Sequence, residues 1–308
     1  MARVQGSELG FCGIIRKSFH ILFSEKKLLS TIAFLFILPL PLVSLALYTV
    51  SLVLYNSIAQ NNSGSDLTLV LLVLVNLFCI LFEIAFYLLS CAAVVYTAAC
   101  SYTGKPITFH KVTKSLCQIW RRLVITSLWC LLISIIYSLV ASIVLTLLAI
   151  FVLANTIGLV VFVILLIIYI IGSIYLNMVF GMAFVISVLE EVYGRESIVH
   201  GKNLLRGKEL VAGSLYVLLA ILAGVIQTIF AIPLILSSGN LGFIILQLIV
   251  ACLVAVLVIL LIQVIQTVLY FACKLHRGED IDETFLSSHL DRYMGLYAPL
   301  MTAEVVEP

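Results

Sequence analysis

The sequence predicts an all-α, polytopic membrane protein whose six transmembrane helices form three hairpin units, each preceded by an amphipathic interfacial helix. The first indication is composition: 63% of the 308 residues are hydrophobic and 10% are charged, against about a quarter charged in soluble domains. The second is that long apolar runs follow one another with little interruption, which leaves no polar shell for a soluble core. The third is the placement of lysine and arginine.

A helix needs about 20 residues to cross a hydrocarbon core of about 30 Å, and six windows are long and apolar enough. One formal charge, Glu83, falls inside them. The second, fourth and sixth windows exceed this length, so we expect them to tilt, bend or project into the cytosol. The windows are 29–55, 67–100, 124–153, 157–189, 211–236 and 241–273, which together form a membrane domain at 29–273 between a cytosolic amphipathic segment at 1–28 and a cytosolic acidic tail at 274–308.

The 17 lysine and arginine residues all lie before the first window, in the loops 101–123 and 190–210, or in the tail. The intervening loops contain none. By the positive-inside rule this predicts that both termini and the two long loops are cytosolic. The protein is therefore expected to be a multi-pass protein of an endomembrane or the plasma membrane.

The three hairpin units begin with similar basic, amphipathic segments that contain Lys17, Lys114 and Lys202 at corresponding places. In two of them apolar residues recur at helical spacing, which predicts helices at the level of the lipid headgroups. These residues are Phe11, Ile14, Ile15, Phe19, Leu22 and Phe23 in the first segment and Val112, Leu116, Ile119, Trp120 and Leu123 in the second.

Basic residues beside such a helix attract anionic lipids of the cytosolic leaflet, each by about 1 kcal/mol. The bilayer and its anionic lipids are thus the first expected partners, through generic anchoring or through specific lipid recognition. The candidate headgroup contacts are Lys17, Lys26, Lys27, Lys114, Arg121, Arg122, Lys202, Arg206 and Lys208.

Glu83 is the residue of greatest functional interest, because a carboxyl at membrane depth is costly unless it is neutral, paired or hydrated. Asn76, Glu83, Ser90 and Thr97 are spaced seven apart and share one helix face, with Tyr87 one turn after Glu83. No basic residue lies within a window, so we expect a neutral acid facing the bundle interior. Two hypotheses remain open: a site for protons or a polar solute, and a structural hydrogen bond to another helix. The candidate structural partners are Gln227, Gln247, Gln263 and Gln266.

Three prolines, Pro39, Pro41 and Pro233, lie within the first and fifth windows and predict bends, because proline removes a backbone donor. Such a bend either opens a cavity or fits a neighbouring helix. Farther along, Glu190, Glu191, Arg195, Glu196 and Lys202 form a cluster of mixed charge that favours a salt-bridged helix junction rather than a catalytic centre.

No sequence motif for catalysis is present: HExxH, GxSxG, the P-loop and the glycine-rich dinucleotide fingerprint are all missing. The five histidines lie in the predicted cytosolic segments without metal-ligand spacing, and none of the eight cysteines lies in a predicted outer loop. We therefore expect no enzyme activity, no cofactor, no metal and no disulfide.

The acidic tail contains the stretch HLDRYMGLYAPL at 289–300. It is too short and too polar to cross a membrane. Either it packs on the cytosolic face, or it presents a short motif to a cytosolic protein partner.

Several stretches, taken together, resemble one family of uncharacterised plant proteins with six spans, some of which are labelled polyadenylate-binding protein-binding protein. The resemblance covers essentially the whole chain and implies an integral membrane protein without an established activity. The label implies a partner in mRNA biology, but without an RNA-binding module we expect no direct binding of nucleic acid. The stretches are LGFCGIIRKSFHILFSEKKLL, LPLPL, VVYTAACSYTGK, WRRLVITSLW, VISVLEEVYGRESIVHGKNLLRGK and HLDRYMGLYAPL.

A more distant resemblance, in span pattern and in the junction LEEVYG to LLRGK, is to the membrane domain attached to some glycerophosphodiester phosphodiesterases. That domain is distinct from the catalytic one, so the likeness implies no hydrolase residues here. The sequence leaves two functional hypotheses. The first is a non-enzymatic membrane organiser that recruits lipid or protein partners; the alternative is a transporter or channel for a small solute or protons along the stripe around Glu83.

Overall fold

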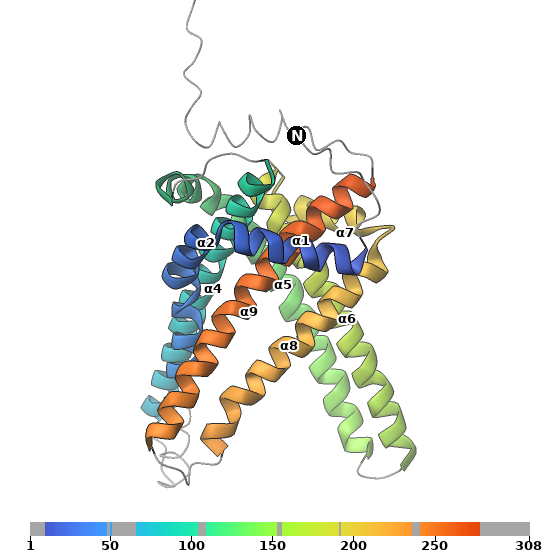
Figure 1. The fold of residues 1–308 in the computed structure, drawn as a ribbon. Helices are drawn as coiled ribbons and strands as arrows, with labels where there is room; N and C mark the ends of the chain where they lie inside the picture. The colour runs from blue at the N-terminus through green and yellow to red at the C-terminus, as the bar shows by residue number, and fades with distance from the viewer. Residues whose placement is uncertain are drawn as a thin grey trace, which may run out of the picture.

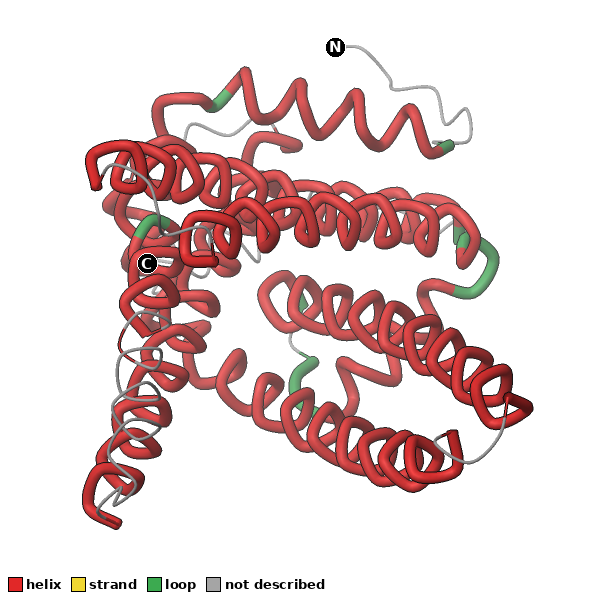
Figure 2. The backbone as a smooth tube through the Cα atoms, turned by 90° about the horizontal axis from the view of Figure 1, so that it is seen from below, coloured by secondary structure: helices red, strands yellow, loops and turns green. Residues whose placement is uncertain are grey.

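The computed structural model describes residues 10–47, 50, 66–103, 109–152, 156–190, 192–235 and 241–277. Within these ranges the chain is helical with short loops and has no strand (Figure 2). The all-α prediction is therefore confirmed. The elements in chain order are α1 (Phe11–Ser24), α2 (Lys26–Ile32), the π-helix η1 (Ala33–Ile37), a helical stretch at 39–47, α4 (Asp66–Thr103), α5 (Phe109–Val152), α6 (Thr156–Leu189), α7 (Arg195–Leu205), α8 (Glu209–Ile235) and α9 (Leu241–His276).

Six helical segments in the described part of the chain are long and apolar enough to cross a membrane, as predicted. Consecutive segments pack as hairpins: η1 against α4, α5 against α6, and α8 against α9. Helix α1 crosses one end of the bundle, near α7 and the last turns of α9 (Figure 1). The segments are Lys26–Leu47, Val70–Ser101, Ile119–Ala149, Gly158–Leu189, Glu209–Ile226 and Leu248–His276.

Burial is concentrated at the end of the bundle that α1 and α7 cover. The second half of α4, the last turns of α6 and the second half of α9 contain most of the fully buried side chains. The opposite halves of α4, α5 and α6 expose large aliphatic side chains on most of their surface. The α5–α6 hairpin leaves the rest of the bundle at this far end (Figure 1). Such an apolar exterior suits a hydrocarbon solvent.

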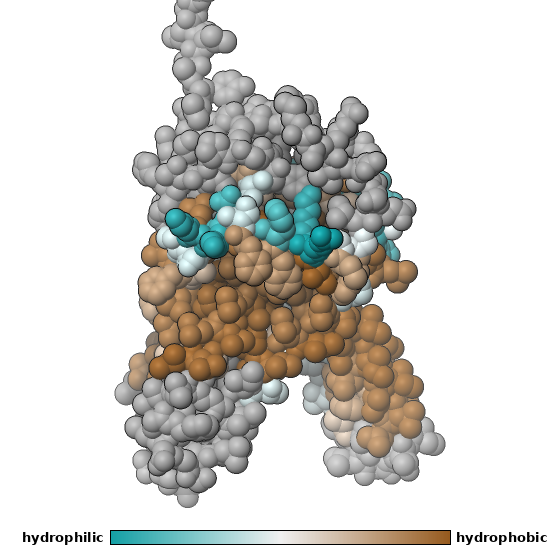
Figure 3. Space-filling view, viewed as in Figure 1, coloured by the Kyte–Doolittle hydropathy of each residue, from teal (hydrophilic) through white to brown (hydrophobic). Residues whose placement is uncertain are grey.

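Helix α1 has the amphipathic character that its sequence predicts, but its buried face points to protein. Ile14, Ser18 and Ile21 are buried where α1 packs on α9. Phe19 and Phe23 remain exposed, Phe23 by 69%. Hydrophilic side chains form a band directly above the hydrophobic surface of the spans (Figure 3). Helix α1 is thus a cover for the bundle that still presents aromatic side chains outward.

The second amphipathic segment does not form a helix of its own. Residues 109–123 are the first part of α5, a single helix of 44 residues. At 1.5 Å per residue such a helix is about 66 Å long, more than twice the hydrocarbon thickness. The physical reason is that no glycine or proline interrupts residues 109–152. Its predicted apolar face is nevertheless buried at Leu116, Ile119 and Leu123.

The prolines of the first span lie next to an irregular turn. The backbone N–H of Leu38 donates to the carbonyl of Ala33, five residues earlier, at 2.8 Å, and this bond closes the wider turn of η1. Pro39 and Pro41 follow at once and contribute no N–H. The turn directs the stretch 39–47 toward α4, where Leu40 and Pro41 line a cavity.

Candidate intramembrane site

A cavity of about 720 Å³ lies between the stretch 39–47 and helices α4, α5, α6, α8 and α9. All of its lining residues belong to the six spanning segments. Aliphatic and phenylalanine side chains make up most of its wall, and Leu131, Ser134 and Ala223 on its rim are exposed, so the cavity opens at the surface of the bundle. The polar residues of the lining are Ser44, Glu83, Tyr87, Ser127, Cys130 and Ser134.

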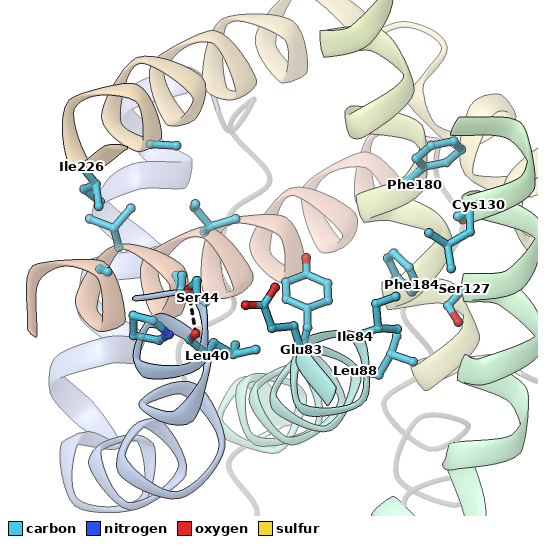
Figure 4. A pocket seen from close by; sticks show the side chains of 18 of the residues that line it. Leu40, Ser44, Glu83, Ile84, Leu88, Ser127, Cys130, Phe180, Phe184 and Ile226 are labelled. Atoms are coloured by element: carbon cyan, nitrogen blue, oxygen red, sulfur yellow. Dashed lines mark hydrogen bonds between the residues drawn. The ribbon is translucent and has the colours of Figure 1, made fainter. Parts of the chain in front are cut away.

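The Glu83 carboxyl group projects from α4 into this cavity (Figure 4). Its Oε1 atom is buried and has no hydrogen-bond partner among the described residues. The Ser44 hydroxyl across the cavity donates to the Leu40 carbonyl of its own helix at 2.8 Å. In the view of Figure 4, Ser127, Cys130, Phe180 and Phe184 lie to one side of Glu83, and Leu40, Ser44 and Ile226 lie to the other.

The predicted polar stripe on α4 is divided among three environments. The Asn76 amide bonds to the carbonyl of Leu72 outside the cavity, whereas Glu83 and Tyr87 line it. Ser90 and Thr97 are fully buried and donate to carbonyls of their own helix. The stripe is therefore not one continuous polar path.

An interhelical hydrogen bond of the predicted kind exists, but it involves Ser90. The Gln263 Nε2 atom of α9 donates to the Ser90 hydroxyl at 2.7 Å, and both side chains are buried. Glu83 makes no such bond to Gln263 or Gln266. The side chains of the other two candidates, Gln227 and Gln247, lie outside the described part.

A second cavity of about 460 Å³ adjoins the first, and the two share Tyr87 and Phe184 as lining residues. These rings meet edge to face with centroids 6.3 Å apart. Tyr216 of α8 and Gln266 of α9 line the second cavity, and the Tyr216 hydroxyl is buried without a hydrogen bond. The sequence gives no signal for Tyr216, because it is an isolated tyrosine in an apolar span.

Gly181 of α6 creates the space that the Tyr216 hydroxyl occupies. A Cβ atom at this position would collide with the hydroxyl and lie 3.1 Å from Gln266 Nε2. Gly181 lies inside the continuous helix α6, and its backbone φ angle is not positive. The absent side chain, rather than backbone freedom, is what the second cavity requires.

A polar junction lies at the end of α6, just beyond the spanning segment. Glu190 accepts hydrogen bonds from the Tyr270 hydroxyl and from Lys274 Nζ, the latter at 2.9 Å, and its Oε2 atom lies 3.5 Å from His200 Nε2. Burial alone would raise the pKa of Glu190. The two hydrogen bonds and the neighbouring charges of Lys274 and His200 outweigh burial and hold this pKa below its ordinary value.

The predicted salt-bridged junction at 190–202 therefore exists with different partners. Tyr270 and Lys274 come from α9, about one turn apart, and His200 comes from α7. A second set of hydrogen bonds lies nearby: the Thr126 and Ser187 hydroxyls are 2.8 Å apart, and the Gly194 N–H donates to Thr126 Oγ1 at 2.8 Å. Together these bonds connect α5, α6, α7 and α9 at this end of the bundle.

The candidate headgroup contacts are distributed over the end of the bundle near α1 and α7. Lys26, Lys27, Arg121, Lys202 and Arg206 are exposed, and Lys17, Arg122 and Lys208 are half-buried. The side chain of Lys114 and the tail stretch 289–300 lie outside the described residues.

Among the described residues, no group of three histidine, cysteine or acidic side chains is placed to hold a metal ion. The thiols that the structure describes as free are Cys12, Cys79, Cys91, Cys130, Cys252 and Cys273.

The helices and cavities define a multi-pass α-helical membrane protein with a mainly apolar intramembrane site that contains one carboxyl group. The chain belongs to the family DUF8558, described as a domain of unknown function, whose model matches residues 3–306. No curated protein and no solved structure matches the chain.

Proposed function

We propose that this protein is a non-enzymatic membrane protein that binds a lipid-like, amphipathic molecule between its spans. The observation that carries the proposal is the cavity of about 720 Å³ inside the spanning region. Ligand sites of about 300–1,000 Å³ with apolar walls and few polar groups are typical of small-molecule binding. A mainly apolar wall that opens beside Leu131 and Ala223 suits a molecule that arrives from the bilayer.

The proposed orientation places α1, α7 and both termini in the cytosol. The positive-inside rule supports it, because the basic residues gather at this end of the bundle. Exposed cations such as Lys26 and Arg121 are then available to anionic headgroups. The organelle is proposed only as an endomembrane or the plasma membrane.

The distant resemblance to a membrane domain that is separate from the catalytic domain of phosphodiesterases is consistent with the proposed non-enzymatic role. A cytosolic protein partner is proposed for the tail. Removing residues 285–308 should abolish capture of such a partner from native membranes, whereas a partner retained by the shortened chain would place the contact elsewhere.

A photoactivatable, clickable acyl-chain probe tests the proposed lipid site. The purified chain in nanodiscs should be labelled at residues that line the cavity, and peptide mapping identifies them. Ala223→Trp places an indole at the opening of the cavity and should reduce labelling by about tenfold, since it obstructs the entry of the ligand. Ile221→Trp, on the same helix but outside the cavity, is the matched control and should leave labelling unchanged. Labelling that is scattered over exposed spans, or is equal in both variants, contradicts the proposal.

A second candidate function, transport of protons or a small solute, is favoured by the unpartnered Glu83 carboxyl in the cavity. Transport requires a path that opens to both sides, whereas Ser90 and Thr97 are packed in the core. Saturable flux into liposomes that disappears in Glu83→Gln would establish transport. Flux that is absent or insensitive to this substitution would exclude Glu83 as its carrier.

A further inference from the structure

The two adjoining cavities differ from most lipid-binding surfaces in their charge. Among the described residues that line them there is no lysine, arginine or histidine, and Glu83 is the one formally charged side chain. An anionic phosphate or carboxylate head group would therefore enter without a cation to pair with it and would approach a carboxyl group. Burying such an unpaired charge at membrane depth is strongly unfavourable. The cavities thus select against anionic lipids.

Two polar groups in the cavities lack partners in the described chain. Glu83 Oε1 is buried without a hydrogen bond in the first cavity. The Tyr216 hydroxyl is buried in the second beside the Gln266 amide, its O–H has no acceptor among the described residues, and Tyr216 as a whole is only 7% exposed. Leaving buried polar groups unpaired costs free energy, and a ligand that pairs with them recovers it.

The unpartnered groups flank a common wall. Tyr87 lies one turn after Glu83 on the same face of α4 and lines both cavities, as does Phe184. The wall is therefore aromatic, with a carboxyl group on one side and a phenolic hydroxyl on the other. Apolar side chains surround both groups, so a polar head group has partners here and an acyl chain has partners in the remainder of the larger cavity.

A hydroxyl group matches this arrangement best. It donates one hydrogen bond and accepts two, so it can donate to the Glu83 carboxyl without adding charge, and an oxygen of the same head group can accept from the Tyr216 O–H. An ammonium group only donates and would also bring a cation into an apolar cavity.

We infer that the adjoining cavities bind an uncharged lipid with a free hydroxyl head group, of the chemical class that includes diacylglycerols, ceramides and sterols. The inference rests on the proposed function, because it names the class of ligand for the same site. Glu83 accepts a hydrogen bond from the hydroxyl, Tyr216 donates one to an oxygen of the head group, and the acyl or ring portion lies along the apolar wall toward the opening beside Leu131 and Ala223.

Competition against the acyl-chain probe tests the head-group class. The full chain in nanodiscs is titrated with a diacylglycerol, its methyl ether, a phosphatidic acid of the same chains, and a long-chain primary alkylamine without a hydroxyl as the amine. The diacylglycerol should compete about tenfold better than the methyl ether, which cannot donate. Its advantage over the phosphatidic acid in displacing the probe should be larger than about tenfold, because the phosphate has no cation to pair with in the cavities.

Substitutions locate the recognition. Tyr216→Phe should weaken the diacylglycerol and its methyl ether alike, by about threefold to tenfold, since an oxygen of either head group accepts from the phenolic O–H that is removed. Glu83→Gln keeps a donor and an acceptor, so it should bind diacylglycerol within about threefold of the original chain. Glu83→Leu should weaken this binding by about tenfold. Tyr175→Phe, an exposed tyrosine of α6 outside both cavities, should change nothing.

The outcomes separate the two proposals. Labelling that never maps to the cavities overturns the lipid-binding function and, with it, this inference. Labelling that maps there but is displaced equally by the methyl ether, the phosphatidic acid or the amine overturns the head-group class alone. The comparison of competitors uses the unsubstituted chain, so it decides the matter even if Tyr216→Phe fails to fold.

Discussion

The end of the bundle near α7 and the far half of the α5–α6 hairpin are both apolar, but they are packed in opposite ways. At α7, a Cβ atom on Gly201 would lie 3.3 Å from Met182 and 3.4 Å from the backbone of Ala183. In the far half of the hairpin, the exposed fractions of Ile143 and Ile171 are 59% and 61%. Protein surrounds the first region, and lipid is the solvent for the second. The difference indicates that the stability of the fold resides mainly at the end that α1 and α7 cover.

The largest effect should come from shortening the same side chain in the two regions. Ile186 is fully buried beside α7, so Ile186→Ala should lower the free energy of unfolding by about 2–5 kcal/mol. Ile143→Ala in the hairpin should change it by less than about 0.5 kcal/mol. Denaturation of both variants in the same detergent measures this. Equal losses would mean that the hairpin is packed against protein after all.

The next effect concerns the turn before α7. Gly194 has φ 71° and ψ −135°, a conformation that other residues adopt only with strain, so Gly194→Ala should cost about 1–3 kcal/mol. Its N–H also donates to Thr126, which connects the turn to α5. Gly213→Ala in α8 is the control, because a Cβ there meets nothing within 4 Å. A midpoint of thermal unfolding as high for Gly194→Ala as for the control would contradict the strain.

The smallest effect is the pH dependence of the Glu190 junction. The pKa of Glu190 is lowered in the folded protein from 4.5, so the folded state binds this proton less readily than the unfolded state. The contribution to stability is therefore present above pH 4.5 and is lost as the pH falls below 4.5 toward the folded pKa. Its size is about 1.5 kcal/mol, the contribution of hydrogen bonds to a charged group.

Glu190→Gln should lower stability at neutral pH and flatten the acid limb of the profile. Glu196→Gln, an exposed acid on α7, should reproduce the original profile. If the loss of stability at acid pH is unchanged in Glu190→Gln, other carboxyl groups cause that loss.

The fold was largely predictable because a membrane permits few solutions. Backbone groups in hydrocarbon must bond within their own helix, so the window 67–100 became α4 at Asp66–Thr103. The continuity of α5 was not predicted. Its amphipathic beginning has the pattern of an interfacial helix, and the pattern alone does not say whether such a helix ends before the span.

The candidate site was predictable only in part. Glu83 stands out because it is the one formal charge in a span. Tyr216 and Gln266 do not, because their importance comes from the approach of α8 and α9 to Gly181, and spacing within one helix carries no information on such approaches. The partners of Glu190 were missed for the same reason: Tyr270 and Lys274 are far away in the sequence.

The wide turn of η1 gives the first span one place where its length can change without disturbing the cavity. A π-turn contains one residue more than an α-turn, so the wide turn absorbs an extra residue and leaves the stretch 39–47 near the orientation it would have in a continuous α-helix. Deleting one residue between Ala33 and Ile37 would let the turn close as an α-turn and keep Leu40, Pro41 and Ser44 facing Glu83. The same deletion in α2 would rotate everything after it by about 100°, so a lineage can lose a residue at η1, but not at α2, without rebuilding the cavity.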